Sequence, residues 1–422
     1  MITTSQLPPM PASGPRQEIR LAELMAAMSL ATDISMDQPM EEGVTICLLA
    51  TRLAGVLGLS ELERVHVYYG ALLRHIGCTA DMHVLAAVAG DDISMRSAFV
   101  GVDLGRPVEM FAAMMRHIGR TYAPLERPMA IVRVMAATGK FRYSGEVQCE
   151  VAEMLASRLG FDESFQRGIS GVLERWDGRG FDPAVVAGFL SKGTELLSVL
   201  EVDSPWDRAL EAEPGERPVL SGRRLDEALR AMGDFADLKS PYTVGHSGGV
   251  ADLAARAAER CGLPSDDVTA TRRAGWVHDI GRVAVSSAIW GKPGPLTRSE
   301  WEKVRLHAYH ADRVLAREGL LESIGRIASM HHERLDGSGY FRQALARQQP
   351  PTARVLAVAD AYHAMTEPRP HRPAIPPTGR TMSTRFCMIC RVRDGQAVSI
   401  HGYWDQLEML EQLGLVPEPA AV

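Results

Sequence analysis

Residues 274–281 read Ala-Gly-Trp-Val-His-Asp-Ile-Gly, and this stretch decides the predicted fold. An apolar run leads into the adjacent pair His278 and Asp279, and Gly281 ends the stretch. A buried aspartate beside a buried histidine is costly unless the pair binds a partner or a metal ion. We therefore expect a helix that carries this pair into the interior of the protein.

Further imidazole and carboxylate groups follow in the second half of the chain, each in or beside a predicted helix. Such groups suit Fe, Mn or Zn, and a bridging carboxylate can hold two ions ~3.5–4 Å apart. The candidate metal ligands are His246, His278, Asp279, His307, His331, His332 and Asp360.

The composition is that of a soluble helical protein with two domains. The 422 residues include 46% hydrophobic and 6% aromatic residues, and Ala, Leu, Arg and Met are frequent. The net charge of −6 argues against a nucleic-acid polymer as partner, whereas a small anionic substrate needs only a local positive site. We find neither a bilayer-spanning stretch nor a signal-peptide core, so we expect a cytoplasmic protein without a membrane partner. The cysteines, including Cys387 and Cys390, are expected to be reduced thiols with a structural role.

Two pairs of similar segments indicate an internal repeat. Residues 174–181 resemble residues 333–340 at an offset of 159, and residues 49–59 resemble residues 253–263 at an offset of 204. Because both pairs occur in the same order, the sequence predicts a tandem duplication with about 45 additional residues in the first copy.

The second copy resembles the HD-GYP phosphodiesterases. The matching motifs are Ser-Pro-Tyr-Thr-Val-Gly-His-Ser at 240–247, His-Asp-Ile-Gly at 278–281, His-His-Glu-Arg-Leu-Asp-Gly-Ser-Gly-Tyr at 331–340 and Ala-Asp-Ala-Tyr at 359–362. The segment Lys-Pro-Gly-Pro-Leu-Thr at 292–297 resembles a turn of the same family. Their order and spacing match over about 150 residues, a third of the chain.

The resemblance implies a metal-dependent phosphohydrolase with two divalent ions, most readily Fe or Mn. One ion would be held by His246, His278, Asp279 and Asp360, and the other by Asp279, His307, His331 and His332. Asp279 would then bridge the ions, and a hydroxide between them would attack phosphorus. Arg282 would bind phosphate. The predicted catalytic residues are thus Asp279 and Arg282, and no further cofactor is expected.

Some positions depart from the family pattern. Arg282 replaces the usual lysine, which keeps the cation but changes its geometry. Phe341 replaces the proline of the Gly-Tyr-Pro element and alters the constraint on that loop. Tyr242 stands where some relatives have a metal-binding glutamate, so we expect two ions and not three. Three further histidines are not expected to be ligands: His310, His363 and His371.

The first copy lacks the ligand set. The landmarks place Glu42 opposite His246, His75 and Ile76 opposite His278 and Asp279, Val172 and Leu173 opposite His331 and His332, and Glu201 opposite Asp360. Because Val, Leu and Ile do not bind metal, this unit is expected to be a helical scaffold that regulates the second unit or dimerises. A homodimer is therefore left open.

The tail has a different pattern. Residues 386–400 alternate apolar and polar side chains around Asp394 and Gly395, which predicts a β-hairpin. Residues 404–414 then read as a short amphipathic helix. This run resembles the end of SnoaL-like polyketide cyclases.

The expected fold class is all-α: two tandem HD-like helical domains with a short β-hairpin and helix as a tail. The divisions are 1–16 (disordered), 17–202 (degenerate HD-like domain), 203–220 (linker), 221–375 (HD-GYP-type phosphohydrolase domain) and 376–422 (SnoaL-like fragment).

The predicted function is hydrolysis of a cyclic dinucleotide second messenger, with cyclic di-GMP as the expected substrate. The metal ligands specify no base, so other cyclic dinucleotides, or a linear product, stay open as substrates. Two alternatives remain: a catalytically weak signalling module that binds metal and nucleotide, and a phosphohydrolase of mononucleotides.

Overall fold

The structure is a computed structural model. It describes residues 17–80, 82–99, 111–112, 115–116, 118, 127–136, 148, 150–162, 164–165, 183–317, 319–372, 374, 386–393 and 396–404. Several predictions fall outside these residues: disorder at 1–16, the landmark at Val172 and Leu173, the repeat segment 174–181, the turn at Asp394 and Gly395, and the helix over 405–414.

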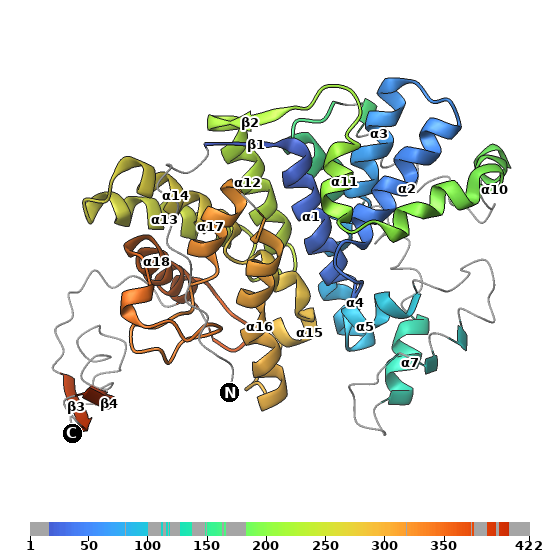
Figure 1. Cartoon of the computed structure of the whole chain (residues 1–422). Helices are drawn as coiled ribbons and strands as arrows, with labels where there is room; N and C mark the ends of the chain where they lie inside the picture. Colours follow the sequence, from blue (N-terminus) through green and yellow to red (C-terminus); the bar gives the residue numbers. More distant parts are fainter. Residues whose placement is uncertain are drawn as a thin grey trace.

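The described residues are mostly helical, which confirms the predicted all-α class (Figure 1). The first half contains α1 (Leu21–Ser35), α2 (Glu42–Val56), α3 (Glu61–Leu72), η1 (Ile76–Thr79), α4 (Met82–Ala89), α5 (Asp92–Phe99), α7 (Arg127–Ala136), α10 (Pro183–Leu197), η2 (Ser198–Glu201) and α11 (Pro205–Glu211). The second half contains α12 (Gly222–Asp237), α13 (His246–Arg260), α14 (Ser265–Val277), η3 (Ile280–Ala284), α15 (Ser287–Trp290), α16 (Arg298–Leu315), α17 (Leu320–Ala328), η4 (Ala346–Gln348) and α18 (Pro351–Thr366).

Two antiparallel strand pairs complete the described chain. Strand β1 (Glu18–Arg20) pairs with β2 (Val219–Ser221) and so joins the starts of the two halves. Strand β3 (Phe386–Arg393) pairs with β4 (Gln396–Trp404), which is the hairpin predicted in the tail. Because β4 runs to Trp404, this residue does not begin the helix predicted there.

Corresponding elements of the two halves follow one another at a constant spacing. The starts of α2 and α13 are separated by the same number of residues as the starts of α3 and α14. The starts of η1 and η3 are separated by that number as well. This spacing equals the offset between the similar segments 49–59 and 253–263. A buried aspartate near the end of the preceding helix also recurs: Asp33 accepts a hydrogen bond from the Gly43 amide, and Asp237 accepts one from the Ser247 amide. The two halves therefore share the order of their elements and this loop contact.

Helix α1 lies at the centre of the main hydrophobic core. It is apolar on nearly every side, and almost all of its residues are buried, as expected of a helix inside a core. It contacts α2 and α3 of its own half as well as η3 and α16 of the second half. One buried cluster thus contains residues from both halves, and the predicted domain boundaries stay a prediction.

The segment interpreted as a linker contains a packed helix. Helix α11 begins at Pro205, with Ser204 capping it through a hydrogen bond from the Asp207 amide. Its residues Trp206 and Leu210 belong to the main core. Apolar residues at this helical spacing bury one face of α11, which the Pro- and Glu-rich composition of the segment obscured.

Local signals set where the site-bearing helices begin. Thr297 and Glu300 form a capping box at the start of α16. Pro351 stands at the first position of α18, where its missing N–H is not needed. Gly245 has a φ of 83°, which favours glycine, and the turn makes His246 the first residue of α13.

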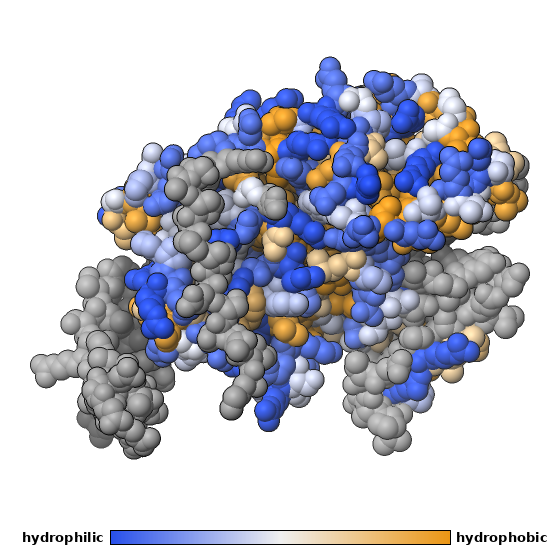
Figure 2. All heavy atoms as spheres, viewed as in Figure 1, coloured by the Kyte–Doolittle hydropathy of each residue, from blue (hydrophilic) through white to orange (hydrophobic). Residues whose placement is uncertain are grey.

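Hydrophilic side chains cover most of the visible face, with hydrophobic residues scattered among them (Figure 2). Among the described helices, none has the length and apolar character needed to span a bilayer.

Candidate metal centre

The structure brings all seven predicted metal ligands together from five elements. His246 begins α13, the pair His278 and Asp279 follows α14, and His307 lies within α16. The pair His331 and His332 follows α17, and Asp360 lies in α18. Six of the seven are buried, and His332 is partly exposed.

Asp279 occupies the centre of the cluster. Its Oδ1 lies 3.5 Å from His307 Nε2 and 3.6 Å from His331 Nε2. Its Oδ2 lies 3.5 Å from His278 Nε2 and 3.8 Å from His246 Nε2. Each carboxylate oxygen therefore faces two imidazoles, which is the arrangement that a bridging ligand requires.

Asp360 closes the side of the cluster next to His246. Its Oδ1 lies 3.2 Å from His246 Nε2 and 3.8 Å from His278 Nε2, and its Oδ2 lies 4.0 Å from His332 Nδ1. Among the described residues, three sets made only of predicted ligands have ligand atoms close enough to share an ion: His246, His278 and Asp360; His278, Asp279 and His331; and His307, His331 and His332. The division of the ligands between two ions stays a prediction.

Backbone carbonyls fix the orientation of three imidazoles. The Nδ1 atoms of His278 and His331 lie 2.7 Å from the carbonyl oxygens of Gly275 and Ala328, each three residues earlier, and His307 makes the same contact with Val304. A carbonyl only accepts, so each Nδ1 carries the proton and each Nε2 keeps a lone pair for a metal.

An unpartnered atom tests whether the site suits a metal. His278 is fully buried, and its Nε2 has no hydrogen-bond partner among the described residues. Because buried polar atoms are nearly always paired, this nitrogen fits a metal ligand. The donor set of imidazoles and carboxylates fits divalent transition metals.

Burial and neighbouring charges set the protonation of the cluster. Burial lowers the pKa of His307 to about 4, and it also lowers the pKa of His331, so both rings stay neutral as ligands must. Burial alone would raise the pKa of Asp279, but the adjacent His278 and Arg282 hold it well below its usual range. The central carboxylate is therefore ionised.

Glu367 and Arg369 are site residues that the sequence did not reveal. Glu367 Oε2 lies 2.8 Å from His246 Nδ1, and Arg369 pairs with Glu367 at 2.8 Å. Burial would lower the pKa of His246, but its hydrogen bonds with Asp360 and Glu367 raise it to about 9. The spacing in the sequence could have revealed Glu367. It follows Asp360 by about two helical turns, and residues at this spacing lie on the same face of a helix.

His363 also lies beside this contact. Its Nδ1 is 3.3 Å from His246 Nδ1, and it forms a fourth set with His246 and Glu367 that could share an ion. That His363 is not a ligand stays a prediction. His310 and His371 belong to none of the sets found among the described residues.

Arg282 is held beside the central carboxylate. Its Nη1 donates to Asp279 Oδ2 at 3.0 Å, and its guanidinium lies 3.9 Å from the ring centroid of Trp290. Its predicted contact with phosphate is untested, but the cation is placed next to the site.

The Gly-Tyr-Phe loop packs on the other side of the cluster. The Tyr340 ring lies 4.8 Å from the His332 ring, and the Phe341 ring lies 5.5 Å from Tyr309. A Cβ at Gly339 would come within 2.4 Å of the Arg334 backbone nitrogen, so glycine is required there. Tyr242 is part of the surface, and its carbonyl accepts a hydrogen bond from Arg369.

At the position of the first half that corresponds to the candidate metal centre, the chain supplies the guanidinium of Arg74. The constant spacing of the elements puts Arg74 and His75 opposite His278 and Asp279, so the pairing expected from the sequence was wrong by one residue. Arg74 Nη2 lies 3.8 Å from Asp33 Oδ1 and 3.9 Å from Glu42 Oε1. A guanidinium thus lies among carboxylates in this half.

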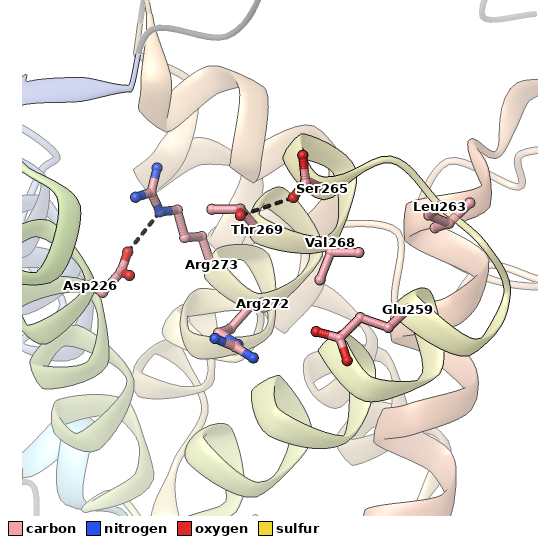
Figure 3. A pocket seen from close by; sticks show the side chains of 8 residues that line it. All are labelled: Asp226, Glu259, Leu263, Ser265, Val268, Thr269, Arg272 and Arg273. Carbon is pink, nitrogen blue, oxygen red and sulfur yellow. Dashed lines mark hydrogen bonds and ion pairs between the residues drawn. The ribbon is translucent and has the colours of Figure 1, made fainter.

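A pocket of about 440 Å³ lies elsewhere, between α12, α13 and α14 (Figure 3). Its wall includes Arg272 and Glu259, and Arg273 bonds Asp226 beside it. No candidate metal ligand lines it, so we assign the chemistry to the buried His and Asp cluster.

Comparison with known proteins places the cluster within a family. Residues 230–381 match the family model described as HD domain. This part of the chain is an HD domain. It contains all seven candidate ligands.

Relatives extend the comparison beyond the HD domain. A 3'3'-cGAMP-specific phosphodiesterase of Vibrio cholerae is 26% identical over 409 residues, which cover 84% of this chain and 88% of that protein. A crystal structure of a cyclic GMP-AMP specific phosphodiesterase of V. cholerae shares the fold, with a TM-score of 0.53 and 23% identity, and covers 85% of this chain and 91% of its own.

A cyclic di-GMP phosphodiesterase of Thermotoga maritima is 36% identical over 150 residues, which are 35% of this chain and 41% of that protein. The chain therefore matches less than half the length of this second relative. The HD domain and these relatives support a metal-dependent phosphohydrolase. The family match ends at residue 381, and the resemblance of the tail to SnoaL-like cyclases stays a prediction.

Proposed function

We propose that this protein is a metal-dependent phosphodiesterase that hydrolyses a cyclic dinucleotide. The observation that carries the proposal is the position of Asp279, whose two oxygens each face two imidazoles within 3.8 Å. The relatives named as cyclic dinucleotide phosphodiesterases support the substrate class.

The proposed centre would hold two divalent ions, with Fe or Mn expected and Asp279 as the ligand shared between them. When bound, such ions lower the pKa of water and stabilise the charge that develops on a phosphoryl group. The carbonyl contacts of His278, His307 and His331 keep each Nε2 directed at the centre. Arg282 supplies a fixed cation at the edge of the centre. We propose that it binds a phosphate oxygen of the substrate.

Two cyclic dinucleotides that differ in their bases are candidate substrates. Cyclic di-GMP is the substrate expected from the sequence, and the T. maritima relative carries that name. The relative that aligns over most of the chain is named as specific for 3'3'-cGAMP. We therefore propose 3'3'-cGAMP as the second candidate.

We also propose that the first half is a duplicated unit without a metal site, acting as a scaffold or regulator. The constant spacing between corresponding elements of the two halves supports the duplication. The guanidinium of Arg74 beside Asp33 and Glu42 supports the loss of metal binding.

The test is turnover of both cyclic dinucleotides by protein loaded with Mn or Fe, beside Asp279→Asn. We expect the substitution to lower kcat/KM by more than ~100-fold, since losing even an outer partner of a ligand costs ~10–100-fold. Asp266→Asn, an exposed residue in the first turn of α14, is the matched control and should keep wild-type activity.

Three outcomes would contradict the proposal. Full activity of Asp279→Asn would remove the metal centre from the mechanism. Metal binding without turnover of either substrate would favour a signalling module. Hydrolysis of mononucleotide esters alone would favour a mononucleotide phosphohydrolase.

A further inference from the structure

Asp92 is a buried carboxylate of the first half that accepts hydrogen bonds from two separate segments of the second half. It is the first residue of α5, and its side chain is fully buried. Its Oδ2 lies 2.7 Å from the fully buried Lys239 Nζ. Its Oδ1 accepts from Ser286 Oγ at 2.6 Å and from the Ser287 amide at 2.9 Å.

These donors belong to two segments that carry candidate metal ligands. Lys239 lies in the turn between α12 and α13, and His246 follows that turn as the first residue of α13. Ser286 and Ser287 lie just after η3, the turn that follows Asp279. The Ser287 hydroxyl also lies 2.9 Å from the Lys239 carbonyl, so the segments contact each other at the same point.

Helix α15 extends this contact toward the metal centre. Ser286 caps the start of α15, and Trp290 ends it. Trp290 Nε1 donates to the Arg282 carbonyl at 3.2 Å, and its ring lies under the Arg282 guanidinium. The same ring lies 5.8 Å from the His307 ring. A shift of α15 would therefore reach both Arg282 and a candidate ligand.

The element that supplies Asp92 has a small core of its own. Helices α4, α5 and α7 share a separate buried cluster of Ala89, Met95, Ile118 and Val134. Figure 1 shows α4 and α5 beside α15 and below α1, and α4 contacts α15. This satellite segment, the described residues of α4, α5 and α7 with Ile118, packs around a small cluster separate from the main core, and a small cluster opens more readily than a large one.

We propose that Asp92 is a positioning residue through which the satellite segment controls the order of the metal centre. With Asp92 in place, the turn before His246 and the segment after Asp279 are fixed to each other. If the satellite segment moves away, Lys239 loses its partner inside the protein and both segments lose their common acceptor. A buried charge without a partner is strongly unfavourable, so the two segments must rearrange.

The geometry favours a positioning role over simple stabilisation. A buried ion pair is weak evidence for stability, because well-packed apolar residues often serve equally well. An acceptor shared by donors from two separate segments specifies their relative position, which apolar contacts would fix less closely.

The experiment compares Asp92→Ala and Asp92→Asn with wild type by three measurements: hydrogen–deuterium exchange of the metal-free chain, Mn²⁺ affinity, and kcat/KM. Asp91→Asn is the control, because Asp91 precedes α5 and its carboxylate accepts hydrogen bonds from Ile93 and Ser94 at the start of that helix. The kinetic measurement rests on the proposed function, whereas exchange and Mn²⁺ affinity do not. A wild type without turnover would therefore remove the proposed function and leave this test intact.

We expect Asp92→Ala to speed exchange selectively in residues 239–246 and 283–291 and to weaken Mn²⁺ binding by ~10–100-fold. Asp92→Asn should be intermediate, because it keeps an acceptor for the serines. Wild-type exchange and affinity in folded Asp92→Ala, or faster exchange spread evenly over the chain, would overturn the proposal. If Asp92→Ala does not fold, Ser286→Ala keeps the ion pair and tests residues 283–291 alone. Wild-type exchange in residues 283–291 and wild-type Mn²⁺ affinity in Ser286→Ala would then overturn the proposal.

Discussion

Replacing Glu367 tests whether the metal centre depends on a residue outside the predicted ligand set. Glu367 Oε2 lies 2.8 Å from His246 Nδ1 and is itself paired with Arg369. A carboxylate on the far nitrogen of a histidine ligand fixes the ring and raises its basicity. In Glu367→Ala the ring keeps only its weaker contacts with His363 and Arg369 at Nδ1.

The size of the effect follows from two opposing contributions. Loss of such an outer partner weakens metal binding by ~10–100-fold, which is ~1.4–2.7 kcal/mol. Glu367 also helps to raise the pKa of His246 to about 9, and a metal at Nε2 must displace that proton. Removing Glu367 lowers this pKa and so assists binding at neutral pH. We therefore expect a net weakening that is larger at pH 8.5 than at pH 6.5.

The assay is titration of metal-free protein with Mn²⁺ at both pH values, with unfolding in urea as an independent measure. At Mn²⁺ of 1,000 times the wild-type Kd, binding adds ~4.1 kcal/mol to the wild type and ~2.7 kcal/mol to a variant that binds tenfold more weakly. Glu322→Gln, in a partly exposed pair with Arg326, is the control for the loss of one carboxylate. Wild-type Mn²⁺ affinity in Glu367→Ala at pH 8.5 would refute the reasoning.

Two further substitutions test the packing and the first half. A Cβ at Gly281 would lie 2.0 Å from the His307 carbonyl oxygen, so Gly281→Ala should cost ~1–3 kcal/mol or more in urea unfolding and weaken Mn²⁺ binding. Gly294→Ala, where a Cβ meets nothing within 4 Å, is its control, and equal stability of the two variants would contradict the packing argument. Burial raises the pKa of Asp33 to about 6, above its value in the unfolded chain. The favourable contribution of Asp33 to the free energy of unfolding is therefore complete below pH ~4 and is lost as the pH rises through 6. Asp33→Asn should therefore gain up to ~3 kcal/mol relative to wild type between pH 4 and pH 8, and a difference that does not change with pH would contradict this.

The sequence predicted the candidate site well because its chemistry is concentrated in a few short motifs. The pair His278 and Asp279, flanked by apolar residues and followed by glycine, indicated a buried polar site. The structure gives the glycine its reason, since Gly281 lies against the backbone of α16. All-helical architecture and the tail hairpin could likewise be predicted, because both follow from local periodicity and turn residues.

Contacts that depend on the packing of distant segments could not be predicted in the same way. Asp92 and Lys239 are 147 residues apart, and neither stands in a motif. Glu367 is the residue after α18, outside the motif that contains Asp360. The pairing of the two halves was wrong by one residue around His75, because the motif similarity there is weak and only the element boundaries fix the register.

The two halves place different groups beside their carboxylates, and this difference bears on how the protein works. In the first half, Arg74 places a covalently attached cation beside Asp33 and Glu42. In the second half, Asp279 faces His307 and His331, whose pKa values burial lowers, and its ligand atoms lie close enough to those of His278 and His331 to share an ion. Because α1 of the first half packs against η3 and α16, the first half supports the turn after Asp279 and the helix that carries His307. The first half therefore contacts two of the segments that position candidate ligands, and this contact is the route by which the proposed scaffold would act on the site.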